Sequence, residues 1–317
     1  MTILACDIGA TRIKFGLVRD GRVLDRDSIP SRSERGLAER LPDLAAALRG
    51  LSTRLGVAIA DCEGISVSIA TLVDVASGRL LAEYGRFRDM PSLDLRAWAR
   101  SEFGLPLALE NDARMAAIGE WRHGAGRGSD DLVMITFGTG LGTGVVIEGR
   151  VLRGRHAQAG CLGGHLTVRY GGRPCGCGNV GCAEAEASTA TLRSVAEQAP
   201  GFDRSSLRHA AKLEYDLVFR EAAAGDPCAV AIRDQSLLVW SSLAVNLIHA
   251  YDPDVLILGG GIMASAETIL PAIRDFVARH AHTPWGKVRV TASQLGDDAA
   301  LVAGEWLLRE QALDVNP

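Results

Sequence analysis

The sequence predicts an α/β protein of two domains with a cleft between them. A strand, a glycine turn and a second strand occur together twice, beginning near residue 3 (ILACDIGATRIKFGLV) and near residue 132 (LVMITFGTGLGTGVVI). The chain has 317 residues, which is enough for two domains that each bury a core. The repeated unit indicates that each half of the chain builds its own sheet.

The first half alternates predicted strands and helices. The segment ILACDIGATRIKFGLVRDGRVLDRDSIP predicts three strands, the last two joined by a turn at Asp20-Gly21. Residues 36–55 carry apolar side chains at helical spacing, with Pro42 near the start. The segments EGISVSIATLVD and LPLALEND predict two further strands, and DARMAAIGEWRHG predicts the helix that follows.

The second half continues with a long apolar helix over residues 229–250, a strand at VLILG and a closing helix at ALVAGEWLLREQAL. No polar linker or low-complexity stretch separates the halves. We therefore place an N-terminal domain at residues 1–118, completed by a C-terminal helix over 298–317, and a C-terminal domain at residues 119–297.

Composition narrows the class of protein. A net charge of −4 gives no electrostatic reason to expect a nucleic-acid partner. The N-terminus MTILACDIG does not resemble a signal peptide, and no run of roughly 18 apolar residues predicts a membrane span. Seven cysteines, an odd number, fit the reducing cytoplasm.

Three cysteines and one histidine lie within eighteen residues: His165, Cys175, Cys177 and Cys182. Three thiolates and one imidazole are the ligand set of a closed, structural Zn²⁺ site, and thiolates discriminate against Mg²⁺ and Ca²⁺. The alternative is a glycine-rich loop with free cysteines. Because Glu184 follows the last cysteine by two residues, we expect the zinc loop to position a functional side chain.

Two glycine turns have the composition of phosphate-binding loops. In DIGAT, Asp7 ends a strand and could hold Mg²⁺ through water, while Gly9 and the Thr11 hydroxyl allow a polyphosphate to approach. In FGTGLGTG, the turn residues are Gly138, Thr139 and Gly140. An ordinary or bulged hairpin is the alternative for each turn. Neither is a Walker A loop or a Rossmann fingerprint, because no Gly-Lys-Ser/Thr follows and the next element is a strand.

A third glycine cluster follows the strand VLIL and consists of Gly259, Gly260 and Gly261. Backbone without side chains there offers a flat surface for a purine, whereas the alternative is a simple turn into a helix.

The dipeptide Asn111-Asp112 joins a predicted strand to a helix. Both residue types favour helix N-termini, so capping is one interpretation. The other is a substrate clamp, in which the Asn111 amide binds a hydroxyl and the Asp112 carboxylate accepts its proton during phosphoryl transfer. The two roles are compatible, because a helix N-terminus also favours the ionised carboxylate.

Together these motifs resemble the ROK family of sugar kinases and repressors, within the sugar kinase, actin and Hsp70 ATPase superfamily. DIGATR resembles the family's DIGGTK, and ENDA, FGTGLGTG, DPDVLILGGGI and CGCGNVGCAE have family counterparts. The resemblance implies an actin-like ATPase fold of the ribonuclease H-like kind, with ATP, Mg²⁺ and structural Zn²⁺ as cofactors and a homodimer as the assembly. It also implies Asp112 as the general base, Asn111, His165 and Glu184 as sugar contacts, and His165 with the three cysteines as zinc ligands.

Two departures from the family pattern fall in the implied sugar pocket. Leu162 stands where the family has a glutamate that binds sugar hydroxyls, and Ser68–Thr71 (SIAT) replaces a Gly-x-Pro-Gly stretch. We therefore expect an ATP-dependent kinase that phosphorylates a hydroxyl of a hexose, an amino sugar or a related polyol. The alternatives are a catalytically weak sugar-binding relative and a sugar-responsive transcriptional regulator. We discount the regulator, because the first strand begins at residue 3 and leaves no room before it for a DNA-binding domain.

Overall fold

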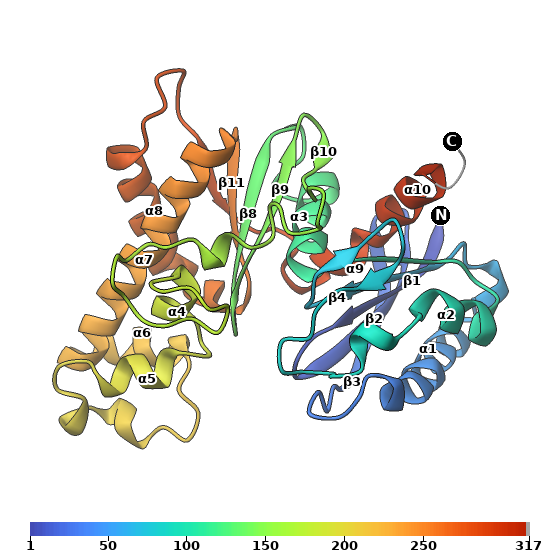
Figure 1. Cartoon of the computed structure of the whole chain (residues 1–317), viewed down its shortest axis with the longest axis horizontal. Helices are drawn as coiled ribbons and strands as arrows, with labels where there is room; N and C mark the ends of the chain where they lie inside the picture. The colour runs from blue at the N-terminus through green and yellow to red at the C-terminus, as the bar shows by residue number, and fades with distance from the viewer. Residues whose placement is uncertain (315–317) are drawn as a thin grey trace. The chain divides into compact units, whose positions relative to one another are not determined.

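The computed structural model describes residues 1–314 and divides into two compact units. Unit 1 contains Met1–Gly128, Val151–Ala159 and the C-terminal segment from Leu295; unit 2 contains Ser129–Arg150 and Gly160–Gln294. Each unit has a five-stranded mixed sheet, which confirms the predicted α/β class (Figure 1). The division into 1–118 and 119–297 stays a prediction.

The unit 1 sheet has the strand order β3-β2-β1-β4-β7. Its strands are β1 (Thr2–Ile8), β2 (Arg12–Arg19), β3 (Arg22–Pro30), β4 (Ile65–Ile69) and β7 (Leu107–Asn111). The first three are antiparallel neighbours, as the sequence predicted, while β4 and β7 run parallel to β1. The C-terminal ends of the parallel strands β1, β4 and β7 therefore lie together. Asp7, Ser68 and Asn111 are found at this end of the sheet.

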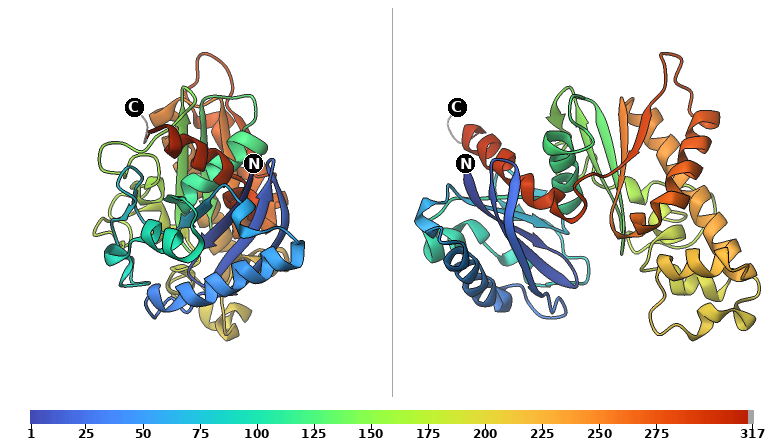
Figure 2. Two further views of the ribbon diagram at one scale, coloured as in Figure 1. Left: turned by 90° about the vertical axis from the view of Figure 1, so that its right-hand side faces the viewer. Right: turned by 180° about the vertical axis from the view of Figure 1, so that it is seen from behind.

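Helices cover both faces of this sheet. They are α1 (Leu41–Leu55), α2 (Leu95–Phe103), α3 (Asp112–His123), α9 (Ala299–Val302) and α10 (Gly304–Asp314). Helix α1 packs on β2 and β3, and Figure 2 shows α9 and α10 on the opposite face, where they contact β1 and β4. A small separate hairpin, β5 (Val73–Asp74) and β6 (Arg79–Leu80), follows β4.

The unit 2 sheet repeats this arrangement with the order β10-β9-β8-β11-β12. Its strands are β8 (Leu132–Phe137), β9 (Leu141–Ile147), β10 (Arg150–Val151), β11 (Val255–Gly259) and β12 (Arg289–Ala292). Strands β8 and β9 are antiparallel across the second glycine turn, and β11 and β12 continue in parallel. The internal duplication predicted from the two strand–turn–strand segments is confirmed.

The unit 2 helices are α4 (Ala183–Ala187), α5 (Leu192–Glu197), α6 (Tyr215–Ala223), α7 (Pro227–Tyr251) and α8 (Ala266–His280). Within the described residues, α7 alone is long and apolar enough to cross a membrane, and 56% of its most apolar window is buried in the protein. The long apolar helix predicted over residues 229–250 is confirmed as α7. Trp240, Leu243 and Leu247 are fully buried, and the Trp240 indole donates to the Ala187 carbonyl at 2.9 Å, as in a core helix.

Three predicted elements have different bounds. The helix predicted for 36–55 starts at Leu41, after a short 3-10 turn. The strand predicted in EGISVSIATLVD ends at Ile69, and its last residues form β5 instead. The closing helix breaks before Gly304, which contacts β4 closely: a Cβ there would lie 2.0 Å from the Ser66 hydroxyl.

Candidate active site and metal centre

Asp7 lies on β1, and its side chain is partly buried. Ser68 on β4 donates a hydrogen bond to Asp7 Oδ1 at 2.7 Å. Burial raises the pKa of Asp7, and the Ser68 hydrogen bond and the Lys14 ammonium oppose that shift. Lys14 in turn binds Asp297 at 2.8 Å. The contact of Ser68 with Asp7 and the nearby Asp297 were not predicted, because they depend on strand pairing and on the return of the chain to unit 1.

The first glycine turn partly satisfies its own backbone. The Gly9 N–H donates to the Arg12 carbonyl at 3.1 Å, so this group serves the turn and not a phosphate. A Cβ on Gly9 would also lie 3.1 Å from the same carbonyl oxygen. Thr11 is exposed, which leaves its hydroxyl accessible to a ligand.

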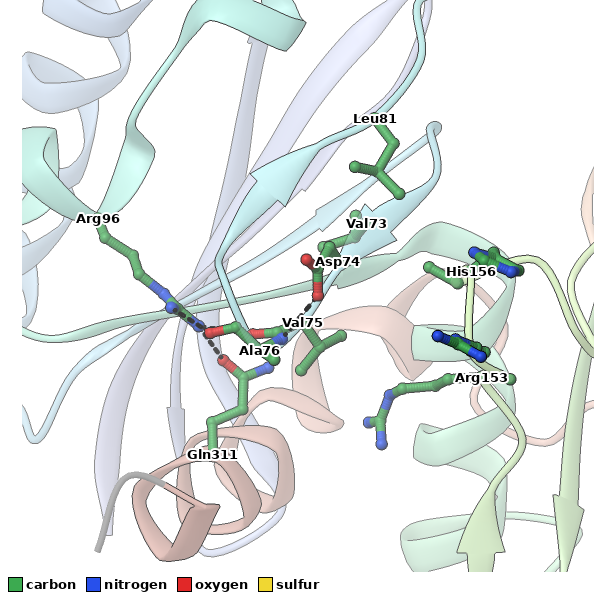
Figure 3. Close-up of a pocket in the computed structure, with 12 residues that line it drawn as sticks. Val73, Asp74, Val75, Ala76, Leu81, Arg96, Arg153, His156 and Gln311 are labelled. Atoms are coloured by element: carbon green, nitrogen blue, oxygen red, sulfur yellow. Dashed lines mark hydrogen bonds between the residues drawn. The ribbon is translucent and has the colours of Figure 1, made fainter.

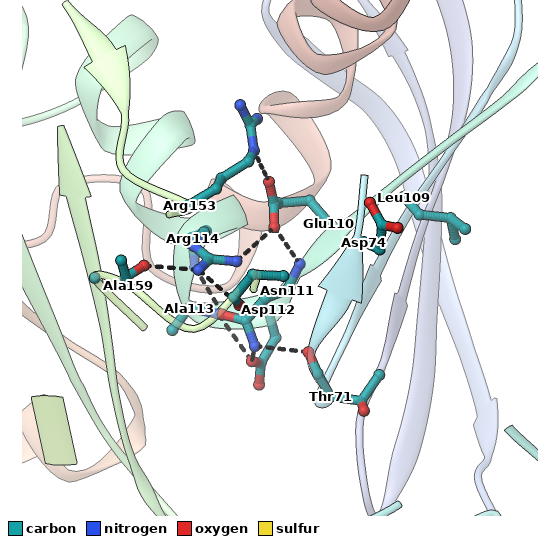
Figure 4. A network of polar contacts seen from close by, with 12 residues as sticks. Thr71, Asp74, Leu109, Glu110, Asn111, Asp112, Ala113, Arg114, Arg153 and Ala159 are labelled. Atoms are coloured by element: carbon teal, nitrogen blue, oxygen red, sulfur yellow. Dashed lines mark hydrogen bonds and ion pairs between the residues drawn. The ribbon is translucent and has the colours of Figure 1, made fainter. Parts of the chain in front are cut away.

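Asn111 caps α3 and is fixed in place by four hydrogen bonds (Figure 4). Its Oδ1 accepts from the Ala113 and Arg114 N–H groups at 3.1 and 3.2 Å. Its Nδ2 donates to the Thr71 carbonyl at 3.1 Å and to Asp112 Oδ1 at 2.9 Å. The capping interpretation is therefore correct, and it leaves room for catalysis because the same bonds orient Asp112.

Asp112 is the first residue of α3. Desolvation raises its pKa to about 6, with a further contribution from the Asp7 charge, while hydrogen bonds from the Ala113 N–H and Asn111 oppose the shift. A carboxyl group with this pKa is mostly ionised at neutral pH and is a better proton acceptor than an ordinary aspartate. Asp7 and Asp112 thus face a common region of unit 1 with suitable chemistry for a metal–phosphate group and a hydroxyl, respectively.

A buried ion-pair network holds the strand-to-helix segment that carries Asn111 and Asp112 (Figure 4). Glu110 and Arg114 are fully buried, and Glu110 Oε1 accepts from the Asn111 N–H at 2.8 Å and from Arg114 at 3.3 Å. Arg153 donates to Glu110 Oε2 at 2.6 Å. Arg114 also donates to the Ala159 carbonyl at 2.7 Å, which ties the ENDA segment to the loop after β10.

Glu184 contacts the second glycine turn in unit 2. Its Oε2 accepts from the Leu141 N–H at 2.9 Å, and a Cβ on Gly140 would lie 2.4 Å from the same oxygen. The other oxygen, Oε1, lies 3.9 Å from His165 Nδ1. The Gly138 and Thr139 carbonyls accept from Thr189 and Ala190 N–H groups at 3.1 and 3.0 Å. One carboxylate therefore joins the phosphate-type turn to the zinc loop.

The three glycines after β11 differ in how far packing explains them. Gly260 has φ of 90°, and a Cβ there would lie 2.3 Å from the Phe137 carbonyl oxygen, so packing on β8 alone requires glycine. A Cβ on Gly259 would meet the Met134 side chain at 2.5 Å. Gly261 has open space beside it and is the glycine of this cluster that packing does not explain.

The structure brings the four predicted metal ligands together in unit 2. The ligand atoms of His165, Cys175, Cys177 and Cys182 all lie within 4.8 Å of one another. The Cys177 and Cys182 sulfurs are 3.7 Å apart, and His165 Nδ1 is 3.5 Å from the Cys175 sulfur. Sulfurs bound to one tetrahedral zinc at about 2.3 Å would be about 3.8 Å apart, so the cluster fits Zn²⁺.

The two departures from the family pattern have different consequences. Ser68 contacts Asp7, and the Thr71 carbonyl holds Asn111, so this segment keeps a role in the site. Leu162 is partly exposed and brings no hydrogen-bonding side chain to its position, just before the turn that carries His165.

The protein has two five-stranded mixed sheets with the same topology, and a glycine turn joins the first two strands of each. An aspartate lies at a strand-to-helix junction. These features define an actin-like ATPase with a kinase-type site. A family model described as the ROK family matches residues 3–311. A glucokinase of Halalkalibacterium halodurans is 30% identical over 96% of this chain and 94% of its own.

Solved structures agree. A ROK family glucokinase from Streptomyces griseus, in complex with glucose and AMPPNP, is 30% identical with a TM-score of 0.82, covering 98% of this chain and 100% of that one. A ROK hexokinase from Thermus thermophilus is 31% identical with a TM-score of 0.79, covering 99% and 100%. The chain belongs to the ROK family. It is a sugar kinase that resembles glucokinases, which confirms the phosphotransferase activity expected from the sequence.

Proposed function

We propose that this enzyme transfers the γ-phosphoryl group of ATP to a hydroxyl of a hexose, with Asp112 as the general base. The observation that carries the proposal is the Asn111–Asp112 pair, in which a fully anchored amide orients a carboxylate whose pKa is raised to about 6. The complex of the Streptomyces griseus relative with glucose and AMPPNP supports the choice of substrates.

In the proposed reaction, the sugar hydroxyl loses its proton to Asp112 as its oxygen attacks the γ-phosphorus. The bond from that phosphorus to the β–γ bridging oxygen breaks, and ADP leaves with the electron pair. Asn111 sits beside the hydroxyl and keeps Asp112 in place, because its amide is bonded to both Thr71 and the carboxylate. A positioned base of this kind contributes typically about 10²–10⁴-fold to the rate.

The nucleotide is assigned to three segments: Asp7 with Gly9 and Thr11, then Gly138, Thr139 and Gly140, then Gly259, Gly260 and Gly261. Mg²⁺ would neutralise the phosphate charge, and Asp7 would hold it through water. Thr11, Thr139 and Gly261 are exposed, so each of the three segments keeps an accessible residue for the nucleotide.

Zinc is proposed to hold the loop on which His165 and Glu184 meet the sugar. His165 would use one ring nitrogen for the metal and leave the other for a hydroxyl. Glu184 supports this placement, because it lies 3.9 Å from His165 while its second oxygen anchors the glycine turn. We further propose a cytoplasmic homodimer as the working form.

The test is sugar-dependent ADP release by the purified chain with ATP and Mg²⁺ across glucose, mannose, fructose, N-acetylglucosamine, N-acetylmannosamine and inositol. We expect a hexose to be phosphorylated, with the product hydroxyl identified by ³¹P NMR. Asp112→Asn is the matched control for contaminating kinases. If no sugar raises ADP release above the level of that control, the proposal is wrong.

A further inference from the structure

A cavity of about 560 Å³ lies in unit 1, apart from the residues assigned to sugar, nucleotide or zinc (Figure 3). One wall is the β5–β6 hairpin region, and the other is the loop that follows β10. Arg96 from α2 and Gln311 from α10 close one end. Its volume lies in the usual range of small-molecule sites, roughly 300–1,000 Å³.

The cavity carries positive charge that the protein does not neutralise. Arg96 donates to the Val75 and Ala76 carbonyls at 2.8 and 3.1 Å and to Gln311 Oε1 at 3.2 Å, all of which are neutral acceptors. Arg155 is exposed on the opposite wall. Among the residues that the structure describes, no carboxylate lies within 4 Å of either guanidinium. Two cations that pair with no carboxylate favour an anionic ligand on their side of the cavity.

Arg153 and His156 extend this basic wall. Arg153 is fixed by Glu110 at 2.6 Å and by Glu310 at 2.6 Å, so its own charge is already paired. His156 is exposed beside it and can donate to an anion. The anion-binding capacity therefore rests on Arg155 and His156, next to a rigid Arg153.

The facing wall offers a hydrogen-bond acceptor. Asp74 lines the cavity and accepts from the Ser77 hydroxyl at 2.5 Å, and this bond is the main cause that lowers the pKa of Asp74. The carboxylate is therefore ionised at neutral pH and would repel an anion close to it, while it would accept hydrogen bonds from hydroxyl groups. Val75 and Leu81 add apolar surface beside it.

We propose that this cavity binds a small phosphorylated polyol, with the phosphate on Arg155 and His156 and the hydroxyl groups towards Asp74. A phosphate monoester provides the dianion for the basic wall, and a polyol provides the donors for the acidic one. This second site goes beyond the proposed kinase reaction and does not depend on it.

The cavity has a direct connection to the sugar-binding segment. Arg153 binds Glu110 Oε2, and Glu110 Oε1 accepts from the Asn111 N–H at 2.8 Å. An anion beside Arg153 weakens its hold on Glu110 by competing for the same guanidinium. Occupation of the cavity is therefore expected to raise the KM for the sugar.

The test is calorimetric titration of the full chain with glucitol 6-phosphate. This ligand is an open-chain polyol, which distinguishes it from the cyclic hexose phosphate that the proposed kinase reaction would produce. Arg155→Gln should weaken its binding by roughly tenfold or more, the value of one charge-assisted contact. Arg100→Gln, an exposed arginine one turn further along α2 and outside the cavity, should leave it unchanged. Equal affinity of the wild type and Arg155→Gln would overturn the assignment.

Two further comparisons test the phosphate and the polyol part of the ligand separately. Glucitol alone should not bind, and inorganic phosphate should bind more weakly than glucitol 6-phosphate. Asp74→Asn should weaken glucitol 6-phosphate but strengthen inorganic phosphate, because it removes a negative charge along with the hydroxyl acceptor. If both ligands change in the same direction, or if phosphate alone binds as tightly as the ester, the polyol part of the proposal is wrong. Glucitol 6-phosphate that leaves the sugar KM of the wild type unchanged would overturn the connection to Asn111.

Discussion

Asp112 is subject to opposing influences on its pKa. Burial and the neighbouring Asp7 charge favour the protonated form, while the N–H groups at the start of α3 and the Asn111 amide favour the carboxylate. The result, a pKa raised to about 6, is close enough to neutral pH for efficient proton acceptance and low enough to keep the group ionised.

Asp112→Asn keeps the size of the side chain and an oxygen that can accept from the Ala113 N–H, but it removes the proton acceptor. We predict a fall in kcat of roughly 10²–10⁴-fold, with sugar binding still measurable by calorimetry. In the wild type, kcat/KM should be constant above about pH 7 and should fall as the pH drops through the Asp112 pKa of about 6. Near-normal turnover in the variant would remove Asp112 from the role of base.

The same shift affects stability. Because the folded pKa lies above the reference value of 3.8, the native state holds its proton more tightly, and the contribution of Asp112 to wild-type stability falls as pH rises from about 4 to 6. Denaturant unfolding should show Asp112→Asn to be more stable than the wild type at pH 7, with the difference vanishing below pH 3.8. An equal difference at both pH values would mean that ionisation of Asp112 is not its cause.

Leu162 is the second residue with a specific prediction. A glutamate at this position could accept hydrogen bonds from sugar hydroxyls, whereas a leucine leaves a desolvated hydroxyl unpaired at a cost of roughly 1–3 kcal/mol. Leu162→Glu should therefore raise kcat/KM for glucose-type sugars relative to the natural substrate. The measurement is a sugar panel on both forms. If the natural enzyme already prefers glucose and the variant only has a lower kcat/KM for it, Leu162 does not occupy the position of the family's glutamate.

At the scale of elements, close approaches decide what each segment tolerates. Gly119 on α3 lies against α9, and a Cβ there would be 2.0 Å from the Ala299 carbonyl oxygen. Gly119→Ala must separate the two helices. It should lower the free energy of unfolding by roughly 1–3 kcal/mol, the usual cost of overpacking. Gly50→Ala on α1 is the matched control, because no atom lies within 4 Å of its Cβ and it should be neutral or stabilising by up to about 1 kcal/mol. Equal stability changes in a urea titration would contradict this packing.

The zinc loop is the second element with a prediction. Purified protein should contain about one zinc per chain, the ratio of a single closed site. Cys177→Ser should lose the metal, lower the melting temperature and weaken sugar binding, because His165 and Glu184 lose their common anchor. Cys161→Ser, close in sequence but outside the cluster, should keep the zinc. Active wild-type protein without zinc by elemental analysis would end this assignment.

The sequence predicted the strands around the glycine turns, since alternating apolar residues and small turn residues are local signals. It also made Asp7, Asn111 and Asp112 candidate site residues by residue type and spacing, and their roles stay predictions. It did not predict the network of Glu110, Arg114 and Arg153, because 43 positions separate Glu110 from Arg153 and only the folded chain brings them together. The break before Gly304 was also missed, and the close contact of Gly304 with Ser66 on β4 is likewise visible only in the folded chain.

At the scale of the whole molecule, the connectivity of the chain sets how its parts can fold. Unit 1 requires the segment from Leu295, while unit 2 lies within the continuous stretch 129–294. Leu301 and Leu307, from α9 and α10, are fully buried, and both helices contact the unit 1 sheet. A fragment of residues 1–128 would therefore expose the sheet face that these helices cover.

We predict that the fragment 1–128 alone aggregates or lacks a cooperative unfolding transition, whereas the fragment 129–294 with zinc unfolds cooperatively. The physical reason is that only the second fragment contains every strand and helix that buries its own core. A single chain in which a glycine-serine linker joins residues 295–317 to the N-terminus of 1–128 is the matched rescue, because it restores α9 and α10 to unit 1 without unit 2. Circular dichroism with thermal unfolding is the measurement. Cooperative unfolding of 1–128 without the added helices would show that the C-terminal segment is not required for the fold of unit 1.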